Sequence, residues 1–195
     1  MLRLDALILA AGAGARFGGG KLLATYAGRP LVEHALNAAF VAPVRSVTLV
    51  TGADARVGPA VEAWAELNGQ RLAIVHAPDH AEGMAASLRA GVAALPAGSA
   101  GAFVFLADMP NTPRATFQAL AAAVLAGAPA AAPVHAGQRG HPAVLSAALY
   151  PQIATLTGDR GARTLLDGLG PALALVPTDD EGVLFDVDRP ADLLS

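Results

Sequence analysis

The fold is decided by residues 4–21, which read LDALILAAGAGARFGGGK. Residues 4–10 are a short apolar run, which predicts a strand buried on both faces of a sheet. A glycine-rich loop follows this run directly. Such a loop can hold phosphate at a strand end, because glycine lets backbone N–H groups turn towards an anion with no Cβ in the way. Arg16 and Lys21 would add positive charge at the same place.

Similar apolar runs alternate with alanine- and leucine-rich helical segments along the rest of the chain. We expect strands at residues 4–10, 46–51, 71–76, 101–107, 130–134, 143–146, 172–176 and 183–187. We expect helices at residues 30–40, 54–67, 82–94, 112–126, 161–169 and 190–194. This order predicts an α/β fold: a Rossmann-like three-layer α/β/α sandwich with a mostly parallel sheet, in a single domain over residues 1–195. In such sheets ligands bind beyond the carboxyl ends of the strands, here the loops after residues 10, 51, 76 and 107.

The composition excludes several classes of protein. Of 195 residues, 54% are hydrophobic and 15% charged, which argues against disorder. A net charge of −3 makes nucleic-acid binding through a basic surface a poor expectation. Without cysteine, the chain has no disulfide, thiolate metal site or cysteine nucleophile, which fits the cytoplasm. The apolar run at residues 6–11 is too short for a signal peptide, and residues 115–134 contain two prolines, so we expect neither secretion nor contact with a membrane.

Two common glycine-loop motifs fit residues 12–20 poorly. A dinucleotide fingerprint requires G-x-G-x-x-G, whereas the third glycine here, Gly18, comes one residue late. A Walker A loop requires a glycine where this chain has Ala15 and a hydroxyl where it has Leu22. Taken alone, the loop could also be a flexible turn with two solvated cations.

The pattern L-A-A-G-x-G-x-R-F-G-x-x-K is intact from Leu9 to Lys21. It resembles the loop of nucleotidyltransferases that join an NTP to a phosphorylated acceptor and release pyrophosphate. Within that superfamily the chain most resembles the molybdenum cofactor cytidylyltransferases, which are MobA-like NTP transferases with a nucleotide-diphospho-sugar-transferase-like fold. The resemblance implies catalytic roles for Arg16 and Lys21. It implies a nucleotide-binding set of Leu9, Ala10, Ala11, Gly12, Ala13, Gly14, Arg16 and Lys21.

Two acidic motifs suggest a metal site. The segment LADMP places Asp108 at the end of an expected strand, where a carboxylate could bind Mg²⁺ or cap the next helix. The segment FDVDRPADL resembles the family pattern D-[IV]-D-T-P-x-D-L, with Arg189 in place of the threonine. The resemblance implies that Asp108 is a catalytic Mg²⁺ ligand and that a second carboxylate assists it. We favour Asp188 over Asp186 for this role, although both could simply cap the last helix.

Three further segments match the family. GMAASL resembles a segment near the nucleobase, which makes Ser87 a candidate nucleotide-binding residue rather than an ordinary mid-helix serine. RGHP and GDRGAR resemble segments of the cytidylyltransferases, and a guanidinium grips phosphate oxygens in a fork. They imply an acceptor-binding set of Arg139, His141 and Arg163, although each segment alone could be a polar turn.

The resemblance implies transfer of CMP from CTP to a molybdopterin-type acceptor, with Mg²⁺ and release of pyrophosphate. Guanylyltransferases of the superfamily usually carry LAGG, so the methyl group of Ala11 favours a pyrimidine. A molybdoenzyme that receives the product is a further candidate partner. The alternatives are a guanylyltransferase or sugar-phosphate nucleotidyltransferase of the same fold, a flavin- or nicotinamide-dependent oxidoreductase, and a non-catalytic carrier of a pterin or nucleotide.

Overall fold

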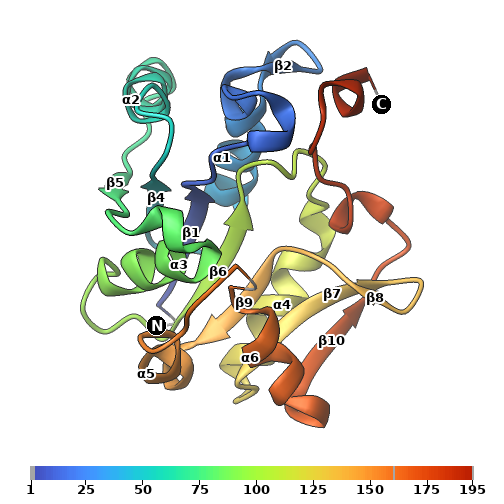
Figure 1. Cartoon of the computed structure of the whole chain (residues 1–195). Helices are drawn as coiled ribbons and strands as arrows, with labels where there is room; N and C mark the ends of the chain where they lie inside the picture. Colours follow the sequence, from blue (N-terminus) through green and yellow to red (C-terminus); the bar gives the residue numbers. More distant parts are fainter. Residues whose placement is uncertain (1–2, 160, 195) are drawn as a thin grey trace.

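The computed structural model describes residues 3–159 and 161–194. Its centre is an eight-stranded sheet in the order β10-β7-β9-β6-β1-β4-β5, with β8 paired to β7 (Figure 1). The strands are β1 (Leu4–Ala10), β4 (Val47–Thr51), β5 (Ala73–His76), β6 (Gly101–Leu106), β7 (Ala130–His135), β8 (Gln138–Arg139), β9 (Ala143–Ser146) and β10 (Leu173–Pro177). Strands β5, β4, β1 and β6 run parallel, as do β7 and β10, whereas β9 is antiparallel to β6 and β7. A separate hairpin joins β2 (Thr25–Tyr26) to β3 (Arg29–Pro30).

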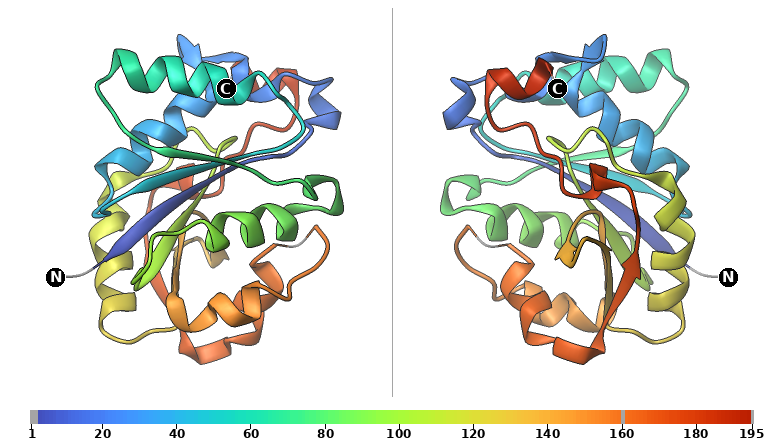
Figure 2. Two further views of the ribbon diagram at one scale, coloured as in Figure 1. Left: turned by 90° about the vertical axis from the view of Figure 1, so that its left-hand side faces the viewer. Right: turned by 90° about the vertical axis from the view of Figure 1, so that its right-hand side faces the viewer.

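Helices cover both faces of the sheet, which makes the expected three-layer sandwich (Figure 2). One face packs against α1 (Leu31–Val41), α2 (Val57–Leu67) and α4 (Phe117–Leu125). The other packs against α3 (Met84–Ala93), α5 (Tyr150–Ile153) and α6 (Arg163–Gly168). Short 3₁₀ helices connect these elements: η1 (Ala15–Phe17), η2 (Lys21–Leu23), η3 (His80–Glu82), η4 (Arg114–Thr116), η5 (Ala147–Leu149), η6 (Gly170–Ala172), η7 (Glu181–Val183) and η8 (Pro190–Leu194). Within the described residues, no helix is both long and apolar enough to cross a membrane.

Strand β1 lies in the middle of the sheet, and all seven of its residues are buried. Its apolar side chains alternate between the two faces, so that Ile8 and Leu7 belong to different halves of the core. Phe103 and Phe105 on β6 pack on Phe117 of α4 with ring centroids 5.8 and 5.6 Å apart. Burial of both faces explains why these strands are continuous apolar runs.

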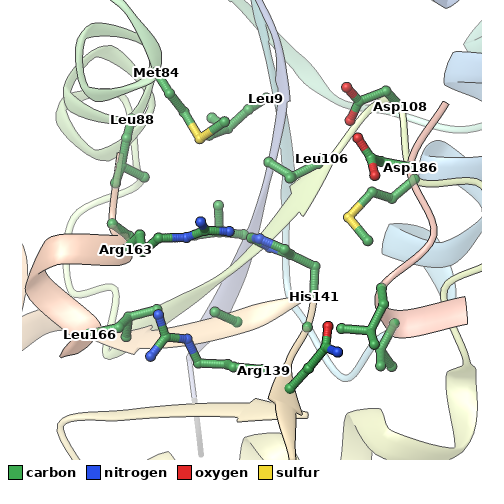
Figure 3. A pocket seen from close by; sticks show the side chains of 18 of the residues that line it. Leu9, Met84, Leu88, Leu106, Asp108, Arg139, His141, Arg163, Leu166 and Asp186 are labelled. Carbon is green, nitrogen blue, oxygen red and sulfur yellow. The ribbon is translucent and has the colours of Figure 1, made fainter. Parts of the chain in front are cut away.

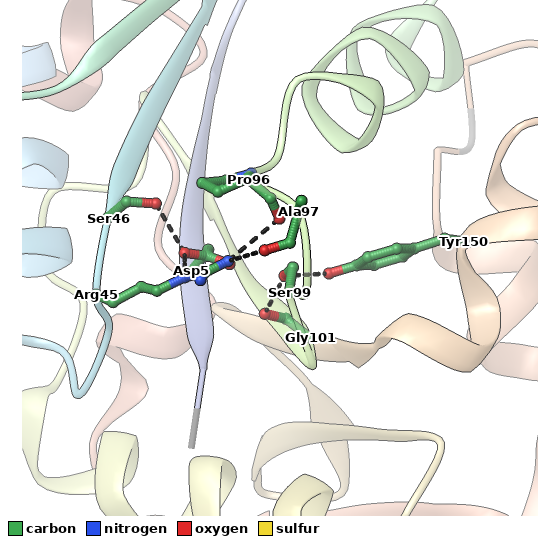
Figure 4. A network of polar contacts seen from close by, with 8 residues as sticks. All are labelled: Asp5, Arg45, Ser46, Pro96, Ala97, Ser99, Gly101 and Tyr150. Carbon is green, nitrogen blue, oxygen red and sulfur yellow. Dashed lines mark hydrogen bonds and ion pairs between the residues drawn. The ribbon is translucent and has the colours of Figure 1, made fainter. Parts of the chain in front are cut away.

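A charged residue interrupts β1 at its amino-terminal end (Figure 4). Asp5 is fully buried, and its carboxylate accepts two hydrogen bonds from Arg45, at 2.9 and 3.2 Å, and one from the hydroxyl of Ser46, at 2.7 Å. Arg45 also donates to the backbone carbonyls of Pro96 and Ala97. The network therefore ties the loops before β4 and β6 to the start of β1.

The carboxyl end of the sheet brings together the loops that the sequence singles out. Leu9 on β1 pairs with Leu106 on β6, so the glycine-rich loop begins beside the segment that carries Asp108. On the other side, Gly52 packs so closely on the loop that an added Cβ would lie 2.6 Å from the carbonyl oxygen of Ala11. The start of the loop is therefore held between the ends of the two strands that flank β1.

Several expected elements differ from the structure. The strand expected at residues 183–187 is wrong: the chain there leaves η7 and crosses the strand ends without joining the sheet. Backbone contacts explain this course, since the N–H of Val187 donates to the carbonyl of Asp108 at 3.0 Å. The helix expected from residue 54 begins at Val57, because the carboxylate of Asp54 accepts from the backbone of Arg56 in a turn. Strands β2, β3 and β8 and helix α5 were not predicted, since each spans only two to four residues.

Candidate active site

The glycine-rich loop consists of two 3₁₀ turns separated by glycines in the left-handed region. Gly14 before η1 has φ 59°, and Gly20 before η2 has φ 68°, a conformation that favours glycine. An added Cβ on Gly12, Gly18 or Gly19 would meet no protein atom within 4 Å. The loop therefore presents an open backbone surface where a ligand can approach closely.

The two loop cations lie against the predicted carboxylates. Lys21 Nζ is 2.7 Å from Asp108 Oδ2 and 3.7 Å from Asp188 Oδ1. Arg16 reaches the other oxygen of Asp188, with its Nη1 2.6 Å from Oδ2. The Lys21 side chain is only 11% exposed, whereas that of Arg16 is 75% exposed. The structure therefore brings together Arg16, Lys21, Asp108 and Asp188, which belong to three distant segments of the sequence.

Asp192 fixes the segment that carries Asp188. Its Oδ2 accepts hydrogen bonds from the backbone N–H groups of Asp188, at 2.8 Å, and Arg189, at 2.7 Å. These backbone hydrogen bonds lower the pKa of the Asp192 carboxyl. No function was predicted for Asp192 from the sequence. The position of Asp192 could have indicated this role, since an aspartate side chain can accept hydrogen bonds from backbone N–H groups three or four residues before it.

Asp186 also lies at this site. Partial burial is the largest cause that raises the pKa of the Asp186 carboxyl, and the negative charges of Asp188 and Asp108 raise it further. Like charges disfavour ionisation of a neighbouring carboxyl, so these three carboxylates lie within electrostatic reach of one another. Among residues 3–159 and 161–194, however, no three acidic or histidine side chains are close enough to form a complete metal site.

A cavity of about 570 Å³ extends from these carboxylates across the sheet (Figure 3). Arg16, Asp108, Asp186 and Asp188 line its charged end. Much of its remaining wall is apolar and consists of Leu9, Met84, Leu88, Val104, Leu106, Met109, Ala143, Ala162, Leu166, Val183 and Leu184. A cavity of this size and composition suits the largely apolar part of a small molecule.

All three predicted acceptor-binding residues line the same cavity. Arg139, at the end of β8, is held by an ion pair with Asp167 at 2.7 Å. Arg163 begins α6, and Figure 3 shows its guanidinium directed towards the ring of His141. Enclosure by the protein lowers the pKa of His141 to about 4, so the ring is uncharged at neutral pH. Its Nδ1 atom is buried and has no hydrogen-bond partner in the described structure.

The predicted nucleotide-binding residues do not all line the cavity. Leu9 lines the cavity, whereas Ala10 and Ala11 are each only 3% exposed. Gly12 and Ala13 lie on the surface and Gly14 is partly exposed. Ser87 is 6% exposed on α3 and is not among the cavity-lining residues, so its contact with a nucleobase stays a prediction.

Comparison with known proteins gives consistent matches over nearly the whole chain. The family model of the MobA-like NTP transferase domain matches residues 6–174. Nicotine blue oxidoreductase of Paenarthrobacter nicotinovorans is 36% identical over 190 residues, which cover 93% of this chain and 90% of that protein.

Solved structures agree in fold. The Mycobacterium tuberculosis protein Rv0371c is similar with a TM-score of 0.80 and 26% identity, covering 97% of this chain and 95% of that one. A nucleotidyl transferase from Methanothermobacter is similar with a TM-score of 0.77 and 26% identity, covering 98% of this chain and 94% of that one.

Proposed function

The chain belongs to the MobA-like NTP transferase domain family, and on that basis we propose that it transfers CMP from CTP to a molybdopterin-type acceptor and releases pyrophosphate. The observation that carries the proposal is the cluster at the strand ends, where Lys21 contacts both Asp108 and Asp188. A loop with open backbone and two cations suits a triphosphate, and carboxylates beside it suit the cation that accompanies one.

In this proposal the glycine-rich loop holds the phosphates that leave as pyrophosphate. Arg16 and Lys21 offset the charge that develops on them, which is the main requirement of phosphoryl-type transfer. An oxygen of the acceptor's phosphate attacks the α-phosphorus in line, the bond to the bridging oxygen breaks, and pyrophosphate departs with the electron pair. That oxygen is already anionic, so no protein base is needed. The protein therefore acts by positioning the two substrates and by neutralising the charge on the leaving phosphates.

The carboxylates present would fit Mg²⁺. Asp108 and Asp188 both lie within reach of one ammonium group, and the pKa of Asp186 is raised partly by their negative charges. A divalent cation on Asp108 and Asp188 would relieve this repulsion and take its other ligands from phosphate oxygens and water. When bound, Mg²⁺ would supply Lewis-acid polarisation of the α-phosphate.

We assign the apolar part of the cavity to the acceptor, with Arg139, His141 and Arg163 as its polar contacts. The choice of CTP rests on the resemblance, since Ala11 stands where guanylyltransferases of the superfamily usually carry glycine; Ala11 itself is only 3% exposed. A GTP-dependent enzyme or a sugar-phosphate nucleotidyltransferase would use the same cluster with a different base or acceptor. A molybdoenzyme would then receive the product.

A second candidate function follows from one comparison. Nicotine blue oxidoreductase shares 36% of residues with this chain, so an oxidoreductase that depends on a flavin or nicotinamide cofactor is a specific alternative. The loop argues against it, because its third glycine is misplaced for a dinucleotide fingerprint. A binding protein that carries a pterin or nucleotide without turnover is a third possibility.

The deciding experiment measures pyrophosphate release from CTP, GTP, ATP and UTP with Mg²⁺, with and without molybdopterin. The proposal expects release with CTP that requires both the metal and the acceptor. Turnover with a different NTP would support another transferase of the fold. NADPH oxidation in the presence of nicotine blue, with no release from any NTP, would favour the oxidoreductase, and binding without any turnover would favour the carrier.

A further inference from the structure

Three consecutive glycines, here called the glycine run, lie directly before Lys21. Gly18, Gly19 and Gly20 have φ angles of 89°, 92° and 68°, so the whole run is in the left-handed region. Glycine loses more backbone freedom on folding than any other residue, so a run of three is costly to keep in one conformation. Gly20 is also the residue before η2, and its carbonyl accepts from the N–H of Leu23 at 3.1 Å. The position of Lys21 therefore depends on what holds this run.

A side chain from outside the loop packs against the last of these glycines. The guanidinium of Arg56 lies where Gly20 has no Cβ: an added Cβ would be 3.0 Å from Nη2 and 3.9 Å from Cζ. By contrast, an added Cβ on Gly18 or Gly19 would meet no protein atom within 4 Å. Arg56 belongs to the segment that connects β4 to α2, so this contact joins two loops at the same edge of the sheet.

Asp54 fixes the position of this guanidinium. Its Oδ1 accepts from Arg56 Nε at 2.8 Å and its Oδ2 accepts from Nη2 at 2.7 Å, which makes a bidentate pair. Oδ1 also accepts from the backbone N–H of Arg56 at 3.1 Å. The side-chain hydrogen bonds from Arg56 lower the pKa of the Asp54 carboxyl, so the pair is ionised at neutral pH. The Asp54 side chain is only 20% exposed, and it holds the more exposed guanidinium against Gly20.

We propose that the Asp54–Arg56 pair fixes the glycine run and thereby the position of Lys21. Arg56 is then a positioning residue, which acts on the reaction through the Lys21 ammonium and not by contact with a substrate. A displacement of about 1 Å in a catalytic group can lower a rate by about 100-fold, so a contact made outside the reacting atoms can still affect turnover. The inference rests on the proposed function for the task of Lys21 in turnover, whereas the effect on the loop does not depend on that function.

Hydrogen exchange of the full chain without added nucleotide tests this effect independently of any activity. In Arg56→Gln the amides of residues 17–23 should exchange about tenfold or more faster than in the wild type, because the glycine run opens more often. Asp54→Asn should have the same effect, since it removes the charge that holds the guanidinium but keeps an oxygen for the Arg56 backbone. The control Arg71→Gln removes an exposed cation before β5, at the opposite end of the sheet, and should not change this exchange.

The unfolding midpoint is measured on the same proteins. An exposed ion pair contributes little to global stability, so the midpoint should be the same in the wild type and in all three variants. Unchanged exchange of residues 17–23 in Arg56→Gln would overturn the proposal. Faster exchange throughout the chain with a lowered midpoint would also overturn it, because Arg56 would then support the fold as a whole.

Turnover tests whether the pair acts through Lys21. Arg56→Gln should lower kcat for pyrophosphate release by about tenfold, the effect of a modest displacement of a catalytic group. Arg56→Lys should recover part of this loss, because an ammonium group can replace the charge but cannot form the bidentate pair. In a Lys21→Gln background, Arg56→Gln should have no further effect, since the residue that it positions is gone. The full loss in that background would show that Arg56 acts on its own, and would overturn the proposal.

The two measurements separate this proposal from the proposed function. If the wild type releases no pyrophosphate from any NTP while Arg56→Gln speeds exchange in residues 17–23, the transferase is wrong and the role of the pair in the loop stands. If pyrophosphate is released and the exchange does not respond to Arg56→Gln, the role of the pair is wrong and the transferase stands.

Discussion

Lys21 Nζ lies 2.7 Å from Asp108 Oδ2, although 87 positions separate the two residues in the sequence. The contact joins the end of the glycine-rich loop to the segment that follows β6. Lys21 is the single lysine of the chain, the other twelve of its 13 basic residues being arginine. A compact ammonium group therefore lies between the two carboxylates that we assign to the metal, where it could also neutralise a phosphate oxygen.

We predict that Asp108→Asn abolishes Mg²⁺-dependent release of pyrophosphate and leaves the fold intact. The change removes the negative charge at the strand end while keeping the size of the side chain. Pyrophosphate release and the thermal unfolding midpoint are measured together, with the exposed Asp179→Asn as the control. Near-normal turnover of Asp108→Asn would show that this carboxylate is not required by the mechanism.

We predict that Lys21→Gln lowers turnover at saturating CTP by about 100-fold or more, the usual effect of losing one group that stabilises charge in a transition state. The control is Arg29→Gln, which removes a cation from the exposed strand β3. The loss should appear in kcat rather than in thermal stability. Unchanged turnover in Lys21→Gln would mean that the loop does not hold the leaving phosphates.

Most strands of the sheet could be predicted from the sequence because buried parallel strands are continuous apolar runs. The limits predicted for β1 and β9 agree with the structure, and those of the other sheet strands differ by one or two residues, apart from the unpredicted β8. The strand expected at residues 183–187 was wrong because alternating apolar residues there contact the site and the core without a neighbouring strand. The pairing of Arg16 with Asp188 depends on tertiary contacts that no local pattern encodes, and only the family resemblance brought these residues together in advance.

The residues of the site could be predicted from the sequence, but their contacts and burial could not. The motifs identified the residues that surround the cavity, including Arg139, His141 and Arg163. They could not reveal that Arg139 is held by Asp167 or that Nδ1 of His141 lacks a partner, because both depend on how α6 packs over β8 and β9. Nor could they reveal that Ser87 is buried.

We predict a specific pH dependence of stability from His141. Its pKa is about 4 in the folded protein, against about 6.5 for an unperturbed histidine. Between these values the unfolded chain binds a proton that the folded chain does not. The free energy of unfolding should therefore fall as the pH falls from 6.5 to 4, by at most about 1.4 kcal/mol per pH unit from this residue.

Chemical denaturation of the wild type and of His141→Phe across this pH range measures the effect. The difference in stability between the two proteins should change across the window and be constant above pH 7. A difference that stays constant from pH 4 to pH 8 would contradict the assignment of an uncharged, enclosed histidine.

We predict that Asp5→Ala destabilises the fold without impairing the site. The carboxylate is fully buried and accepts three hydrogen bonds, so its removal leaves the Ser46 hydroxyl without this acceptor and Arg45 with only its two backbone carbonyl partners. We expect a loss of about 2–3 kcal/mol in the free energy of unfolding. The network lies at the amino end of β1, opposite the active site, so turnover per folded molecule should be retained. Asp179→Ala is the matched control, and equal stability of the two variants would contradict this role.

The proposed function depends above all on the glycine-rich loop and its two cations holding the triphosphate of the nucleotide. Calorimetric titration of the wild type with CTP, CDP and CMP in the presence of Mg²⁺ tests it most directly. We expect affinity to fall strongly from CTP to CMP, and Lys21→Gln to remove most of this difference. Equal affinity for CTP and CMP, or no binding of CTP at all, would contradict it.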